Sequence, residues 1–175
     1  MLTEKAIEAG IERFVDVDSL HGFEARAEFA GFTPPADSEA LRQMCEGLRS
    51  FAELKKAAQD LIPQLQSKIG RKQLEERAPA RLRLRNGRET PVHYERGKPP
   101  WIESRLQDFF GMRETPRIGP NKTPVVMHLL APNRRPVQTT SDLAGFWERL
   151  YPQVRRELMR RYPKHSWPEN PFIAG

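Results

Sequence analysis

Residues 81–94 read RLRLRNGRETPVHY and mark the point where the chain changes from helical to strand-like sequence. Leucine and arginine alternate over the first five of these residues, which is the period of two of a strand with one buried face. Asn86-Gly87 follows at once and favours a type I′ turn, because both residues tolerate a positive φ angle. The sequence therefore predicts a β-hairpin whose return strand covers about residues 88–95.

Beyond the hairpin, the spacing of apolar residues over 101–110 predicts an amphipathic helix that Gly111 closes. Pro99-Pro100 separates this helix from the hairpin. Short extended segments are predicted further along, at residues 117–118, 124–130 and 137–139.

The last predicted element is the longest helix, which starts from a cap at Thr140 or Ser141 and reaches about Arg161. Pro152 removes one hydrogen bond inside it, so we expect a kink or a restart there. Its predicted apolar stripe consists of Leu143, Trp147, Leu150, Val154 and Leu158.

Upstream of the hairpin the sequence predicts a series of short helices. Thr3 is a candidate cap for the first, and the pair Ser50 and Glu53 forms a capping box that starts another. The last helical segment ends near Arg77, before Pro79. The remaining predicted helices cover about residues 19–30 and a segment that begins at Asp37 or Ser38.

These patterns predict an α+β fold, in which an N-terminal bundle of short helices precedes a small antiparallel sheet with two packed helices. The predicted boundary divides the chain into a helical subdomain, residues 1–78, and a basic α+β domain, residues 79–175. Charge follows the same division: residues 1–80 carry 11 Lys or Arg against 14 Asp or Glu, and residues 81–175 carry 18 against 9. A basic surface of this kind is typical of proteins that contact phosphate.

Several classes of function are excluded or disfavoured. The chain lacks the glycine-rich phosphate loop and the acidic metal-holding motif of ATPases, so we expect no catalytic residues and no ATP hydrolysis by this chain. Its four histidines are far apart in the sequence, and Cys45 is the only cysteine, so no metal site is expected. Cys45 lies on an apolar helix face and is interpreted as a buried structural thiol. The N-terminus does not resemble a signal peptide and no apolar run could span a bilayer, so we expect a cytoplasmic protein without membrane contact.

Three features are candidates for contact with nucleic acid: strand arginines, loop arginines, and the basic last helix with its tail. The candidate residues are Arg81, Arg83, Arg134, Arg135, Arg156, Arg160, Lys164 and Trp167. Each feature has an alternative interpretation: the arginines lie on solvated faces, and Trp167 pins the tail to the domain surface instead of stacking on a base.

Four blocks of sequence carry a specific resemblance. They are RRYPKHSWPENP (160–171), LLAPNRRPVQTTSDLAGFW (129–147), RLQDFFG (105–111) and LEERAP (74–79). Together they resemble the C-terminal region of HrpB-type ATP-dependent helicases, bacterial relatives of the DEAH-box RNA helicases. The likeness is strong over about residues 72–171 and weaker over 5–60.

The resemblance implies a non-catalytic accessory module of an ATP-dependent RNA helicase, which adds non-specific RNA-backbone binding and docks to the helicase core. Its implied partners are RNA, or another single-stranded nucleic acid, and the helicase motor domains. No cofactor is expected here, since ATP and Mg would belong to the motor lobes. Both a fragment of a longer helicase and a free-standing protein remain open. The alternative is a protein–protein interaction module without nucleic-acid binding.

Overall fold

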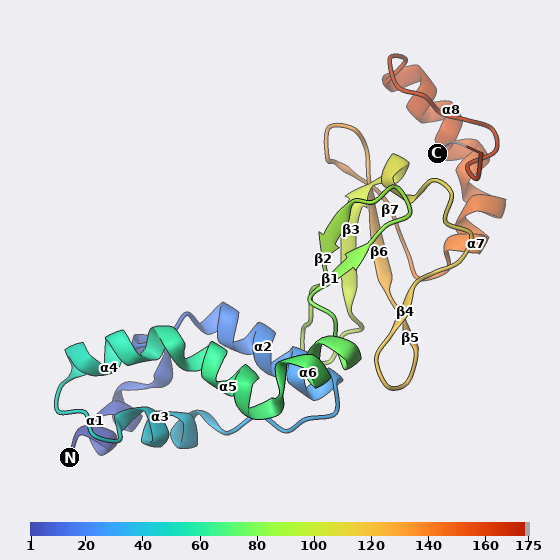
Figure 1. Ribbon diagram of the computed structural model, residues 1–175. Coiled ribbons are helices and arrows are strands. Elements are labelled where there is room, and N and C mark those ends of the chain that lie inside the picture. Colours follow the sequence, from blue (N-terminus) through green and yellow to red (C-terminus); the bar gives the residue numbers. More distant parts are fainter. Residues whose placement is uncertain (174–175) are drawn as a thin grey trace. The chain divides into compact units, whose positions relative to one another are not determined.

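The structure is a computed structural model that describes residues 1–173 and contains two compact units (Figure 1). The helical unit comprises Met1–Ala78 together with the short segment Tyr94–Arg96. The strand unit comprises Pro79–His93 and the described chain from Gly97 onward. The chain therefore leaves the helical unit, returns to it for three residues, and leaves it again.

The helical unit consists of short helices, as the sequence predicts. They are α1 (Leu2–Ala9), η1 (Ile11–Arg13), α2 (Val17–Phe29), α3 (Asp37–Cys45), α4 (Phe51–Ala57), η2 (Ala58–Asp60), α5 (Leu61–Ile69) and α6 (Arg71–Arg77). Their buried faces supply a core that includes Leu20, Phe23, Leu41, Leu54, Leu61, Leu65 and Leu74. The thiol of Cys45 is free and buried in this unit.

Local sequence decides where these helices begin and end. Ser50 accepts a hydrogen bond from the backbone N–H of Glu53 (3.2 Å), so the predicted cap of α4 is confirmed. The Glu53 carboxylate accepts from the N–H of Arg49 (2.7 Å), the residue before the cap, so the predicted capping box forms in a variant that is shifted by one residue. Gly10 adopts a φ angle of +82° and ends α1. Thr3 lies inside α1 and is not its cap.

The segment Tyr94–Arg96 is attached to α2 by one ring contact and one ion-pair cluster. The ring of Tyr94 lies 5.4 Å from that of Phe29, measured between centroids. Arg96 Nη2 lies 3.1 Å from a carboxylate oxygen of Glu24 and 2.9 Å from one of Glu28. Glu24 is only 5% exposed, and this burial raises its pKa while the charge of Arg96 partly opposes the rise.

The described part of the strand unit, up to residue 173, contains seven short strands and one long helical region. Its elements are β1 (Arg81–Arg83), β2 (Glu89–Pro91), β3 (Trp101–Arg105), η3 (Leu106–Phe109), β4 (Arg117–Ile118), β5 (Thr123–Pro124), β6 (Val126–Leu130), β7 (Pro136–Thr140), α7 (Leu143–Gly145), η4 (Phe146–Leu150) and α8 (Tyr151–Arg161). The predicted α+β class is confirmed. β1 pairs with β2, and β4 with β5, both antiparallel, while a three-stranded sheet has the order β3-β6-β7.

The expected sheet is wrong in one pairing, since β3 runs parallel to β6 and only β6 and β7 are antiparallel. The predicted helix over residues 101–110 is also wrong. Trp101–Arg105 is a strand in which Ile102 and Ser104 are buried, and only a 3-10 turn follows it. Apolar residues at this spacing fit either structure locally, and pairing with β6 along the whole segment, together with an isolated bridge between Trp101 and His93, decides for the strand.

The hairpin forms where the sequence predicts it, with a different turn. The N–H of Gly87 donates to the carbonyl of Leu84 (2.9 Å), and the N–H of Leu84 donates to the carbonyl of Arg88 (2.7 Å). Gly87 has a φ angle of +87°, whereas Asn86 has no positive φ. The connection is therefore a three-residue loop with a bulge at glycine, and the type I′ prediction is wrong.

The last helical region restarts at Pro152, as expected, but its register changes before that point. Asp142 is the cap, through a hydrogen bond from the N–H of Gly145 (3.0 Å), in place of Thr140 or Ser141. A π-helical turn, η4, inserts one extra residue before α8. Tyr151, at 1% exposure, is consequently buried in place of Leu150, which the sequence assigns to the apolar stripe and which is 41% exposed.

None of the helices within residues 1–173 has the length and apolar character that a membrane crossing requires.

We expect Arg96→Met to lower the unfolding free energy of the helical unit by about 1–3 kcal/mol near neutral pH, because Glu24 is left ionised, buried and unpaired. A carboxyl whose pKa is raised by folding stabilises the folded state less as the pH rises through its titration range. The loss should therefore be smaller at about pH 4, where Glu24 is protonated more often. Urea unfolding followed by circular dichroism at both pH values measures it.

The matched control is Lys72→Met, which removes the exposed pair of Lys72 and Glu76 (3.9 Å) and should cost no more than about 0.5 kcal/mol. In a Glu24→Gln background the effect of Arg96→Met should shrink. An equal loss in both backgrounds would contradict the pairing.

Candidate nucleic-acid interface

A buried carboxylate, that of Asp108 in η3, joins several segments at one end of the strand unit. Asp108 is 3% exposed and accepts hydrogen bonds from the hydroxyl of Ser104 (2.6 Å) and the side-chain amide of Asn86 (3.1 Å). The guanidinium groups of Arg105 and Arg88 lie 3.5 Å and 3.8 Å from its oxygens. The β1–β2 turn, the end of β3 and η3 are thereby tied to one another.

Arg85 extends this connection to Gly111, two residues after η3. Its Nη1 donates a hydrogen bond to the carbonyl of Gly111 (2.9 Å). Gly111 has a φ angle of +88°, and a Cβ atom there would stand 2.8 Å from Cδ of Arg85. The N–H of Gly111 in turn donates to the carbonyl of Pro171 (2.7 Å), so glycine at this position lets the turn and the C-terminal tail meet.

The tail is folded back onto α8 by its aromatic residues. Trp167 is 5% exposed, and its indole N–H donates to the carbonyl of Tyr162 (3.0 Å). The guanidinium of Arg155 donates to the backbone carbonyl of Trp167 (2.6 Å). The hydroxyl of Tyr151 donates to the backbone carbonyl of Pro168 (2.7 Å). Burial raises the pKa of Tyr151 to about 12, so it remains a donor at neutral pH.

Of the two interpretations of Trp167, stacking on a base does not fit this geometry, because the side chain is buried. The alternative interpretation, in which Trp167 pins the tail, fits the observed contacts. Lys164 is exposed on the same tail, beside His165, whose Nδ1 lies 3.2 Å from the amide nitrogen of Gln107 in η3. Lys164 is therefore held near the end of the unit that Asp108 organises.

Arg134 and Arg135 lie in the tight loop between β6 and β7. The N–H of Arg134 donates to the carbonyl of Ala131, and the N–H of Ala131 donates to the carbonyl of Arg135, both at 2.8 Å. Asn133 closes the turn by accepting the N–H of Arg135 at 3.1 Å. Both arginines are exposed, and within the described chain neither side chain pairs with a carboxylate.

Topology brings this loop to the same end of the sheet as the Asp108 network. β3 and β6 are parallel, with Arg105 in register with Leu130, so both strands end at the same edge. Figure 1 shows the β1–β2 turn, η3 and the β6–β7 loop together at that edge. We call this surface the basic end; its cations are Arg85, Arg88, Arg105, Arg134, Arg135 and Lys164.

The other predicted candidates lie on different elements. Arg81 and Arg83 are exposed on β1, where Arg83 is in register with Glu89 on β2. Arg156 and Arg160 are exposed on α8. The structure thus unites the loop arginines and Lys164 at one end, and leaves the strand and helix arginines on their own elements.

Sequence reasoning missed the part of Asp108, Arg88 and Arg105 in this surface. The alternation of leucine and arginine up to Arg85 and the turn at Asn86 are visible in the sequence. Arg105 and Asp108, in contrast, fall within the segment for which the sequence predicts a helix. When Trp101–Arg105 is a strand, Ser104 is buried near its end and lies beside the buried carboxylate of Asp108. A buried carboxylate needs hydrogen-bond donors, and the Ser104 hydroxyl is one of them.

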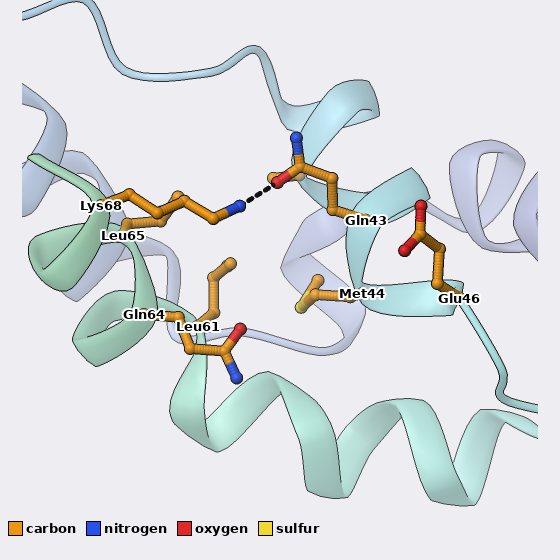
Figure 2. A pocket seen from close by; sticks show the side chains of 8 residues that line it. Gln43, Met44, Glu46, Leu61, Gln64, Leu65 and Lys68 are labelled. Carbon is orange, nitrogen blue, oxygen red and sulfur yellow. Dashed lines mark hydrogen bonds between the residues drawn. The ribbon is translucent and has the colours of Figure 1, made fainter.

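The helical unit has a separate groove between α3 and α5, of about 380 Å³. Figure 2 shows Lys68 of α5 reaching across to Gln43 of α3, with Met44 and Leu61 directed into the space between the helices. The ammonium group of Lys68 donates to the Gln43 side-chain oxygen at 2.6 Å. With Glu46 on its rim, this groove combines an apolar floor with polar edges and does not resemble a phosphate site.

Among the described residues, no group of three or more His, Cys, Asp or Glu side chains is arranged to hold a metal ion.

We expect Asp108→Ala to lower the unfolding free energy of the strand unit by about 2–4 kcal/mol, because the variant leaves buried donors and Arg105 without their acceptor. Urea unfolding followed by tryptophan fluorescence measures this, since the three tryptophans, Trp101, Trp147 and Trp167, all lie in the strand unit. Glu103→Ala, which removes an exposed carboxylate on the preceding strand β3, is the control and should change stability by about 0.5 kcal/mol or less. Equal midpoints for the two variants would refute this role of Asp108.

Comparison with known proteins identifies the chain's relatives. Residues 40–171 match the family model HrpB_C, described as the C-terminal region of ATP-dependent helicases. Over 98 residues, or 56% of this chain, the sequence is 38% identical to the ATP-dependent RNA helicase HrpB of Escherichia coli (strain K12), of which the match covers 12%.

Two crystal structures of E. coli HrpB, described as a DExH-box NTPase and as a DEAH/RHA helicase, are similar to nearly the whole chain. Their TM-scores are 0.83 and 0.71, each at 25% identity, over 97% and 94% of this chain. The chain covers 23% of each solved chain, so it corresponds to a small part of the full helicase. Because the family model matches well over half of its residues, the chain belongs to the C-terminal family of HrpB-type ATP-dependent helicases.

Proposed function

We propose that this chain is a non-catalytic accessory module of an ATP-dependent RNA helicase, and that its basic end binds the RNA backbone without sequence specificity. The observation that carries the proposal is the gathering of cations from four separate segments at one end of the strand unit. The relative in E. coli is named as an RNA helicase, which favours RNA as the nucleic acid.

The charge of the basic end supports a phosphate ligand. The basic end includes one buried carboxylate, that of Asp108. The oxygens of this carboxylate already accept hydrogen bonds from Ser104 and Asn86 and face the guanidinium groups of Arg88 and Arg105. Arg134 and Arg135 extend from a loop with no carboxylate partner in the described chain. Arginines that are free in this way can bind phosphate oxygens without first giving up an internal ion pair.

The helical unit would supply the second part of the function, which is docking to the helicase core. Relatives of known structure are about four times longer than this chain, since it covers 23% of them. The groove between α3 and α5 is a candidate surface for those additional domains, because apolar side chains such as Met44 lie there beside amide and oppositely charged groups, a mixture that suits a protein partner. In this proposal the motor domains bind ATP and Mg²⁺, this chain binds neither, and the assembly acts in the cytoplasm.

We expect the chain to bind a fluorescently labelled single-stranded RNA at about 50 mM salt and to lose affinity steeply as salt rises. The double variant Arg134→Gln/Arg135→Gln should bind about 10-fold more weakly at low salt. The slope of log affinity against log salt should become shallower by about 1.4, since each lost phosphate contact on a single strand contributes about 0.7. Fluorescence anisotropy over a series of salt concentrations measures both quantities.

Arg149→Gln is the matched control, because Arg149 is an exposed arginine that already pairs with Asp142 at 3.1 Å. It should leave the slope unchanged. If the wild-type chain does not bind RNA even at low salt, the RNA role is lost and a protein-interaction module without nucleic-acid binding becomes the better interpretation.

A further inference from the structure

A cleft of about 470 Å³ opens at the basic end, between the β1–β2 turn, η3 and the C-terminal tail. This volume lies within the range of about 300–1,000 Å³ that is usual for small-molecule sites. Its walls differ in chemistry. One is polar and includes Arg85, Asn86 and Gln107, and the other is apolar and includes Phe110, Phe172 and Ile173.

The polar wall offers positive charge. Asp108 also lines the cleft, but its carboxylate is committed to Ser104 and Asn86. Arg85 makes one hydrogen bond, from Nη1 to the carbonyl of Gly111, and that bond fixes the guanidinium at the wall. Its remaining N–H groups have no acceptor within the described chain, so the cleft is suited to an anionic group.

The apolar wall offers an aromatic ring in a fixed position. Phe172 lines the cleft and also a neighbouring pocket that contains Arg113 and Trp147. The guanidinium carbon of Arg113 lies 4.5 Å from the centroid of the Phe172 ring, and the Trp147 ring is 6.4 Å away. Arg113 and Trp147 contact the Phe172 ring on the side of the neighbouring pocket, and Phe172 also lines the cleft.

Gln107 supplies hydrogen-bonding capacity between the two walls. Its amide nitrogen is 3.2 Å from Nδ1 of His165, while its side-chain oxygen is buried without a hydrogen-bond partner among the described residues. Unsatisfied buried acceptors are rare in folded proteins. Gln107 also lines the cleft, so a hydrogen-bond donor on a bound ligand is a candidate partner for this acceptor.

We infer that this cleft binds one nucleotide of a single-stranded RNA, with its base against Phe172, its base edge toward Gln107 and its phosphate on Arg85. The inference rests on the proposed RNA binding and adds a specific site to it. A nucleotide combines a planar apolar face, an edge of donors and acceptors, and an anionic group, and these match the three parts of the cleft. Inorganic phosphate would use Arg85 alone.

The test is chemical-shift mapping of the ¹⁵N-labelled full chain with three probes: adenosine monophosphate, inorganic phosphate and an oligoadenylate RNA of about eight nucleotides. We expect adenosine monophosphate and the RNA to shift the backbone amides of Asn86, Gly111 and Phe172. Inorganic phosphate should leave Phe172 unchanged. Phe172→Leu, which keeps an apolar side chain and removes the ring, should weaken RNA binding about 5-fold or more, and so should Arg85→Gln.

Phe51→Leu in the helical unit and Arg149→Gln are the matched controls and should bind RNA as the wild type does. If RNA binds while these amides do not move, the inference is wrong and the proposed function stands. If phosphate alone reproduces the shifts and Phe172→Leu has no effect, the cleft is only an anion site and the inference is again wrong. If the wild-type chain binds no RNA, the proposed function fails and the inference fails with it.

Discussion

The carboxylate of Asp108 is the interaction on which the arrangement of the strand unit depends. It is almost fully buried, and burying a charge is costly unless hydrogen bonds and opposite charges surround it. Ser104, Asn86, Arg88 and Arg105 meet that requirement from the end of β3 and from the hairpin turn. Because the carboxylate needs all these groups, it fixes where the turn lies against the end of β3 and against η3.

The same requirement has a consequence for charge at the protein surface. The Asp108 carboxylate neutralises part of the basic end from within, and Arg85, Arg134, Arg135 and Lys164 keep their charge toward solvent. The inner guanidinium groups are thus paired with a carboxylate, while the outer cations make the surface positive. A positive surface of this kind suits non-specific contact with a phosphate backbone. The helical unit, with its groove between α3 and α5, has a different chemistry that favours a protein partner.

How much the sequence could predict depends on the range of the interactions involved. The helix cap at Ser50, the hairpin position and the restart at Pro152 were predictable, because each rests on residues a few positions apart. The helix predicted over residues 101–110 failed, since its apolar spacing fits a strand as well and only the distant β6 could decide. Trp167 was ambiguous for a similar reason, because its burial depends on how the tail folds back on α8.

By itself, the sequence determined the α+β class, the division of charge along the chain, the absence of ATPase motifs and the resemblance to one helicase family. These follow from composition, short spacings and local motifs, which do not depend on where distant segments meet. Only the tertiary structure decided that β3 lies parallel to β6, that a π-helical turn buries Tyr151 in place of Leu150, and which arginines share the basic end. Those outcomes depend on long-range pairing and on the need to satisfy a buried carboxylate, and neither is encoded in the spacing of neighbouring residues.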